Sequence, residues 1–189
     1  NECVGNLGNL AKLVIHIVPE WSFELGNTVD LKLIDRNSSV HPLSGSSWNY
    51  RYNADGYCIF GADHLTNLIQ TYTQFFRNGI IEATEVRCIS GYKNKEVYNW
   101  SSLQGQLTRV ISDYGTHLDM LNVPKPWHIS ATLLNAKGYF TNTGWDTSAP
   151  IERDIVNSLE SICTEEHSLQ DALKQVFNSL SNAFGIAYE

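Results

Sequence analysis

The stretch that decides the fold runs from Ile69 to Ile89 and reads IQTYTQFFRNGIIEATEVRCI. Aromatic and β-branched residues fill both halves, and the dipeptide Asn78-Gly79 stands between them. Asn-Gly supplies the two positive φ angles that a type I′ turn requires. The stretch therefore predicts a hairpin of two antiparallel strands.

A two-residue loop would fix the register of this hairpin. Phe75 then lies opposite Glu82, and Arg77 lies opposite Ile80. Arg77 and Glu82 become diagonal neighbours on one face, close enough for their long side chains to meet. The two groups either fix the hairpin as an ion pair or present themselves to a ligand, and the sequence leaves both alternatives open.

A second hairpin precedes this one. Residues 48–53 read WNYRYN, Asp55-Gly56 follows, and residues 57–60 resume an apolar strand. Alternation places three aromatic residues on one face and Arg51 with Asn53 on the other. The aromatic residues are Trp48, Tyr50 and Tyr52. We expect their rings to face the core, because strand aromatics mainly bury area. The alternative is that they stack on bases or on the ring of a ligand.

Two further segments are predicted strands. Residues 13–18 are apolar at nearly every position, which is typical of a strand covered on both faces. Residues 127–134 are also read as a strand. Residues 151–163 fit a helix by their spacing and a strand by their β-branched content, so both remain open.

Two segments are predicted amphipathic helices. Apolar residues recur at spacings of three and four over residues 100–121 and again over residues 169–184. Ser168 with Asp171 resembles a capping box, and Gly185 suits the position after a helix end. The fold class is therefore α+β: a mostly antiparallel sheet with two hairpins, covered by at least two amphipathic helices.

The composition of the chain limits the classes of function that it can have. The chain has 189 residues, 42% hydrophobic and 17% charged, with 13 basic against 20 acidic side chains and a net charge of −7. This excludes a disordered chain and disfavours a dedicated nucleic-acid module, which carries a basic face. No apolar stretch is long enough to span a membrane, and the cysteine usage predicts a cytoplasmic protein.

The first residue is Asn, and the only Met is Met120. We therefore interpret residues 1–189 as a single globular domain, a C-terminal fragment of a larger protein. The four cysteines are read as reduced thiols, mostly buried, because none forms a C-x-x-C pair: Cys3, Cys58, Cys88 and Cys163. A nucleophilic role for Cys58 or Cys88 with a distant His is the minor alternative. The histidines lack the spacing of metal ligands, so we expect no metal and no cofactor.

Three segments in order carry a family resemblance. They contain H-x-x-P at His16–Pro19, R-x-N-x-D-G at Arg51–Gly56 and F-R-N-G-x-x-E at Phe76–Glu82. The series resembles the C-terminal region of bacterial proteins that carry an N-terminal DNA-binding domain of the Schlafen AlbA type, and is weakest from about residue 137 onward. The resemblance implies regulation, sensing or oligomerisation for this chain. It implies DNA contact only through a domain outside the chain, and it transfers no catalytic residue.

The sequence therefore predicts a non-enzymatic sensor or interaction domain of a bacterial, DNA-associated, multidomain protein. Its partner is a protein, a second copy or a small ligand, bound through the polar residues of the two hairpins: Arg51, Asn53, Asp55, Arg77, Asn78 and Glu82. One alternative is a metal-dependent hydrolase or nuclease that uses Asp55, Asp63 and Glu82. Another is a single-stranded nucleic-acid-binding module that stacks bases on the three aromatic residues of the first hairpin.

Overall fold

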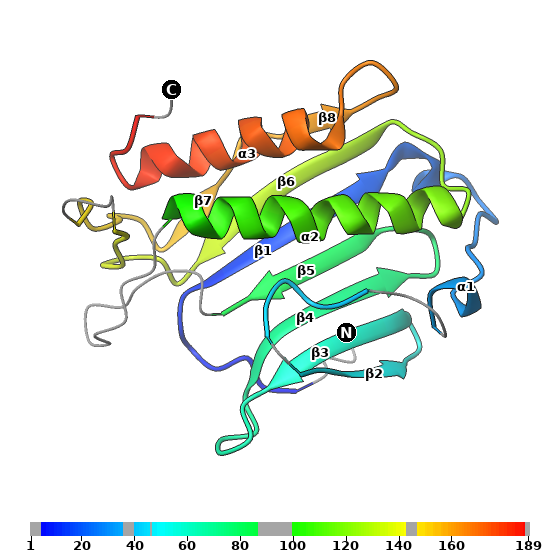
Figure 1. Ribbon diagram of the computed structural model, residues 1–189, viewed down its shortest axis with the longest axis horizontal. Coiled ribbons are helices and arrows are strands. Elements are labelled where there is room, and N and C mark those ends of the chain that lie inside the picture. Colours follow the sequence, from blue (N-terminus) through cyan, green and yellow to red (C-terminus); the bar gives the residue numbers. More distant parts are fainter. Residues whose placement is uncertain (1–4, 36–39, 46, 87–99, 143–146, 188–189) are drawn as a thin grey trace.

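The computed structural model describes residues 5–35, 40–45, 47–86, 100–142 and 147–187. Within these residues one sheet of antiparallel pairs carries the strands in the order β2-β3-β4-β5-β1-β6-β7, and β8 also pairs with β6 (Figure 1). The strands are β1 Lys12–Pro19, β2 Asn49–Tyr52, β3 Gly56–Ala62, β4 Ile69–Phe76, β5 Ile81–Glu85, β6 Trp127–Leu134, β7 Ile155–Asn157 and β8 Ser161–Cys163.

The helices cover one face of this sheet. Helices α2 (Trp100–Met120) and α3 (Leu169–Ala183) lie side by side on it, while β2 forms an edge beyond their reach (Figure 1). A 3₁₀ turn, η1 (Glu20–Phe23), and a short helix, α1 (Lys32–Asp35), complete the described helical elements. The predicted fold class, a mostly antiparallel α+β sheet with two hairpins and at least two covering helices, is confirmed.

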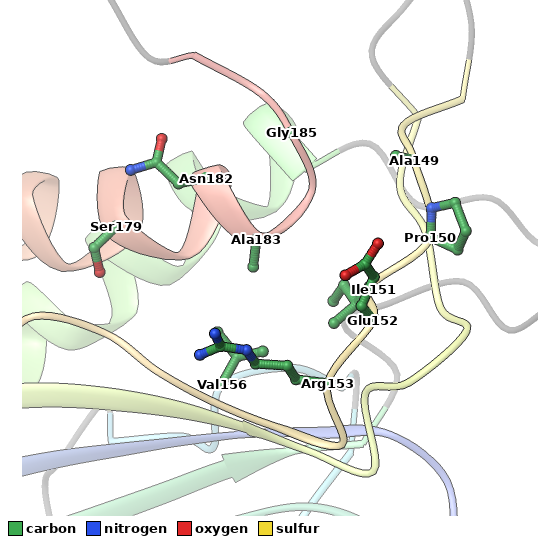
Figure 2. Close-up of a pocket in the computed structure, with 10 residues that line it drawn as sticks. All are labelled: Ala149, Pro150, Ile151, Glu152, Arg153, Val156, Ser179, Asn182, Ala183 and Gly185. Carbon is green, nitrogen blue, oxygen red and sulfur yellow. The ribbon is translucent and has the colours of Figure 1, made fainter.

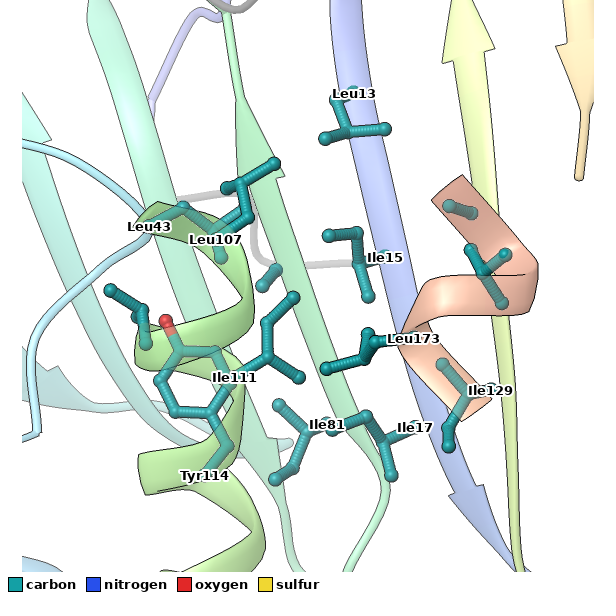
Figure 3. Packing of buried hydrophobic residues seen from close by; sticks show 14 of the residues in the cluster. Leu13, Ile15, Ile17, Leu43, Ile81, Leu107, Ile111, Tyr114, Ile129 and Leu173 are labelled. Carbon is teal, nitrogen blue, oxygen red and sulfur yellow. The ribbon is translucent and has the colours of Figure 1, made fainter. Parts of the chain in front are cut away.

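The core lies between the helices and the sheet. On β1, Leu13, Ile15 and Ile17 are buried against the helices, and they pack with residues such as Ile111 and Leu173 (Figure 3). The alternate residues of β1 are only half-buried, because they point to the other side. The prediction that this strand is covered on both faces is therefore wrong. The sequence of this strand is nearly all apolar because two of its outward-facing residues, Val14 and Val18, are apolar as well.

The hairpin of β4 and β5 has a longer loop than the sequence predicts. The backbone N–H of Phe76 donates to the carbonyl of Ile80 at 2.9 Å, which leaves three residues in the loop. Gly79 adopts a positive φ of 85°, whereas Asn78 does not. This combination fits a three-residue loop whose last residue is left-handed. The predicted two-residue type I′ turn is therefore wrong.

This change shifts the register by one residue. Glu82 lies opposite Gln74, and Phe75 lies opposite Ile81. Because side chains alternate across a strand, a one-residue shift turns Glu82 to the other face of the sheet. The predicted pairing of Phe75 with Glu82 is wrong for this reason.

The C-terminal region resolves the remaining alternatives. Residues 151–163 contain the two short strands β7 and β8 rather than a helix. Helix α3 begins as predicted, since the Ser168 hydroxyl accepts the N–H of Asp171 at 3.2 Å and donates to its carboxylate at 2.6 Å. It ends before Gly185, which has a φ of 70°.

Candidate functional site

One row of residues crosses the open face of the sheet, which we define as the face opposite α2 and α3. The register places one residue from each of six adjacent strands in this transverse row: Arg51, Cys58, Gln74, Glu82, His16 and Ser130. Residues directly opposite each other on neighbouring strands point to the same face. The row thus joins Arg51 and Glu82, two of the predicted site residues, on one surface.

A hydrogen-bonded network lies at the centre of this row. His16 Nε2 is 3.0 Å from Glu82 Oε2, and the Tyr72 hydroxyl donates to Glu82 Oε1. The hydrogen bond with His16 lowers the pKa of Glu82 and outweighs the opposing effect of its partial burial. The other ring nitrogen of His16 has no hydrogen-bond partner among the described residues. Glu82 therefore orients an imidazole whose second nitrogen is available to a ligand.

The neighbours of His16 resemble part of a hydrolase site. Ser130 lies opposite His16 on β6, and Glu82 lies opposite it on β5. Acyl transfer also needs backbone N–H donors aimed at a developing oxyanion. The paired strands around His16 direct their N–H groups into the sheet's own ladder instead. This geometry suits binding better than acyl transfer.

Apolar side chains border the transverse row on both sides. Successive outward-facing positions on each strand flank it, and most of these residues are half-buried. On one side lie Phe60, Tyr72 and Val14, and on the other lie Phe76 and Val18. The open face thus has a polar row that apolar side chains of β3, β4 and β1 flank.

Two of the predicted site residues hold the hairpin tips together. Arg77 donates from Nε to the carbonyl of Ala54 at 3.1 Å and from a terminal nitrogen to the carbonyl of Asn53 at 3.4 Å. The Asn53 amide in turn forms two hydrogen bonds with the Gln74 amide, at 2.8 and 3.3 Å. These contacts place the two tips at one edge. They also occupy Arg77 and Asn53 in positioning that edge.

The predicted contact between Arg77 and Glu82 is wrong. The register shift leaves Arg77 at the hairpin tip, and Glu82 bonds to His16 and Tyr72. Asn78 accepts the N–H of Ile80 at 3.5 Å within its own loop. The backbone of Asp55 accepts the N–H of Arg77 at 3.0 Å. Of the six predicted residues, Arg51 and Glu82 lie on the transverse row, and the other four lie at or beside the tips.

The aromatic residues of the first hairpin are exposed. Trp48 is 41%, Tyr50 61% and Tyr52 46% accessible to solvent, so the prediction that they face the core is wrong. They lie on the helix side of the sheet, but at an edge strand that the helices do not reach (Figure 1). The rings of Tyr50 and Tyr52 instead pack on the buried Tyr57, with centroids 5.9 and 5.0 Å apart.

The carboxylates of the hydrolase alternative lie apart. Asp55 precedes β3 and Asp63 follows it, so a whole strand of about 20 Å separates them. Asp63 accepts the backbone N–H groups of Leu65 and Thr66 at 2.9 and 3.0 Å. Across the described ranges, no three His, Cys, Asp or Glu side chains come close enough together to hold a metal ion. These carboxylates do not share a site.

A second histidine on the open face bridges three segments. His128 on β6 contacts Glu20 through Nε2 at 3.0 Å and Glu160, in the loop between β7 and β8, through Nδ1. Hydrogen bonds to both carboxylates raise the pKa of His128. Sequence reasoning did not identify His16, Tyr72 or His128 as site residues, because only the strand order brings their partners to them.

The helix side carries a shallow cleft. Its volume is about 470 Å³, and it lies between residues 149–156 and the end of α3 (Figure 2). Glu152 and Arg153 supply its charged groups. None of the predicted site residues lines it.

Two cysteines fall within the described residues. Cys58 and Cys163 are both buried, as expected, and burial raises the pKa of Cys163. Cys3 and Cys88 lie outside the described residues. Among the helices that the structure describes, none is long and apolar enough to cross a membrane.

Comparison with known proteins adds no relative. No family model matches the chain, and no curated protein and no solved structure is significantly similar to it. The functional argument therefore depends on the geometry of the open face.

Proposed function

We propose that this chain is a non-enzymatic sensor or interaction domain of a bacterial, DNA-associated, multidomain protein, and that it binds its ligand or partner on the open face of the sheet. The observation that carries the proposal is the transverse row. It sets a cation, Arg51, and an oriented imidazole, His16, on one surface with apolar margins. Interaction surfaces commonly combine apolar area with a few placed polar groups.

The geometry of the row supports binding in two further ways. Glu82 and Tyr72 fix the ring of His16, which lowers the cost of ordering that side chain when a ligand binds. Arg51 is exposed on the edge strand and forms no side-chain hydrogen bond or ion pair with the other described residues, so it can reach a partner. The resemblance to C-terminal regions of Schlafen AlbA-type proteins agrees with a regulatory role.

A ligand screen tests this proposal. Small polar molecules and short peptides are screened by ligand-observed NMR against the wild type and against Arg51→Ala and His16→Ala. We expect the hits to be lost in both variants and kept in Lys174→Ala, an exposed change on α3 behind the sheet. Circular dichroism checks that each variant is folded. Hits that bind the folded row variants as well as the wild type would contradict the proposal.

The exposed aromatic residues favour a second candidate, single-stranded nucleic-acid binding. Three accessible rings on and just before β2 can stack bases, at about 1–3 kcal/mol for each base. The net charge of −7 opposes this function. Titration with labelled oligonucleotides decides it. Salt-dependent binding that Tyr50→Ala weakens would support stacking, and the absence of binding at low salt would reject it.

A further inference from the structure

The open face combines polar positions, such as Lys12, Thr84 and Thr132, with many apolar ones. Antiparallel sheets that face solvent on one side usually place polar residues there. Here the outward positions carry eight large apolar or aromatic side chains. They are Val14, Val18, Phe60, Tyr72, Phe76, Leu134, Ile155 and Ile162. Ile155 and Ile162, at the β7–β8 side, are 56% and 41% exposed. Such a surface favours coverage by another protein surface.

The charges at the two ends of this face are opposite. Arg51 lies at the β2 end, and Glu20 and Glu160 lie around His128 near the other end. The side chains of both glutamates are more than half exposed, at 57% and 62%. A face with a cation at one end and anions at the other is complementary to itself under a two-fold rotation that exchanges the two ends.

We propose that the open face binds a second copy of this chain, which gives a symmetric sandwich of two sheets. The two-fold axis runs parallel to the strands, near β5, the middle of the seven strands in order. This arrangement sets β2 of one copy over the β7–β8 end of the other, so Arg51 approaches Glu160 of the second copy. It also sets β4 over β1, which brings Tyr72 and Phe76 onto the two outward valines of β1. The inference rests on the proposed binding role of this face.

The centre of the interface contains one unfavourable pair. Glu82 on β5 lies close to the axis and therefore to its own symmetry mate. Its hydrogen bonds with His16 and Tyr72 spread the charge and offset part of this repulsion. Because these hydrogen bonds satisfy the Glu82 carboxylate within its own copy, the polar transverse row can lie inside an interface that apolar residues border.

The area of the face suits a weak dimer. Seven strands spaced about 4.8 Å apart and about 20 Å long cover about 600 Å² per copy, or about 1,200 Å² in total. This is near the lower limit for a specific interface. The dimer is therefore expected to dissociate on dilution into the micromolar range.

Sedimentation velocity across a dilution series, from about 1 to about 500 μM, tests the inference. The wild type is compared with Arg51→Glu, Asn157→Lys and the double variant. Asn157 lies on the open face of β7, where the second copy would bring Arg51, and it does not touch His128. We expect each single variant to weaken the dimer at least tenfold, and the double variant to recover most of that loss.

Lys174→Glu on α3 provides a control with a matched change of charge, and we expect it to dimerise like the wild type. A wild type that stays monomeric at every concentration would overturn the inference. A dissociation constant of the dimer that is unchanged in both single variants would also overturn it. Neither result affects the proposed function, which the ligand screen decides separately. A wild-type monomer whose hits still depend on Arg51 would leave that function standing.

Discussion

The Nε2 atom of His16 lies 3.0 Å from Oε2 of Glu82, and this contact joins β1 to β5 on the open face. The hydrogen bond with His16 lowers the pKa of Glu82 below its ordinary value of 4.5. A carboxyl group whose pKa is lower in the folded state stabilises the fold above its unfolded pKa. That contribution is lost as the pH falls through the folded pKa. The hydrogen bond between His16 and Glu82 therefore links two central strands and weakens in acid.

We expect Glu82→Gln to lower the free energy of unfolding by about 1 kcal/mol at pH 7. The loss should shrink as the pH falls below about 4.5 and through the lowered pKa of the folded state, because the wild-type carboxyl group then becomes protonated and no longer accepts a charge-assisted bond. Urea denaturation at both pH values measures the difference. Glu152→Gln, an exposed change on the helix side, provides the control. An equal loss at both pH values would contradict the role of ionised Glu82.

His128 should show the opposite pH dependence. Its two carboxylate partners raise its pKa, so it stabilises the fold below its unfolded pKa of about 6.5 and ceases to do so as the pH rises through the folded pKa. We expect His128→Gln to cost less than about 1 kcal/mol at pH 6, since the pair is largely exposed, and almost nothing at pH 9. Unfolding at the two pH values, compared with the wild type, measures this. A cost that grows with pH would contradict the assignment.

The sequence predicts the elements of this fold well, because they depend on local patterns. The apolar spacing of 100–121 and 169–184 is enough to identify both helices. Hairpins are similarly local, and the sequence predicts both of them. The register of the β4–β5 hairpin is harder to predict, because Asn78-Gly79 suits a two-residue and a three-residue loop alike. The side chains of Val123 and Trp21, distant in sequence, pack around Gly79 in the observed loop.

The candidate site was less predictable than the fold. The sequence predicts Arg51 and Glu82 as site residues, but His16 joins them only because β1 inserts between β5 and β6. The exposure of Tyr50 also could not be read from its strand. An alternating strand buries its aromatic face only where a helix lies over it, and which strands the helices cover is a property of the whole sheet.

Gly79 offers a direct test of the corrected loop. Its φ of 85° disfavours any residue with a Cβ atom, and an added Cβ would lie 3.2 Å from the Val123 side chain. We expect Gly79→Ala to destabilise the fold by about 1–2 kcal/mol. Gly105→Ala, within α2 and with open space around the new Cβ, should instead stabilise it by about 0.5–1 kcal/mol. Thermal denaturation of both variants measures the contrast. Equal effects would contradict the left-handed conformation of Gly79.

The variant Arg77→Ala tests whether Arg77 positions the hairpin tips or binds the ligand. Its guanidinium group holds the carbonyl groups of Asn53 and Ala54, in the turn of the neighbouring hairpin. We expect Arg77→Ala to cost about 1 kcal/mol and to speed hydrogen exchange of the Gly56 amide beside that turn, because the two tips separate more easily. Hydrogen–deuterium exchange of residues 53–57 measures the change. Arg51→Ala is the matched control, since it removes an arginine from the open face of the same hairpin and should leave this exchange unchanged. If Arg77→Ala left exchange at the tip unaltered and instead abolished ligand binding, Arg77 would belong to the binding surface rather than to its support.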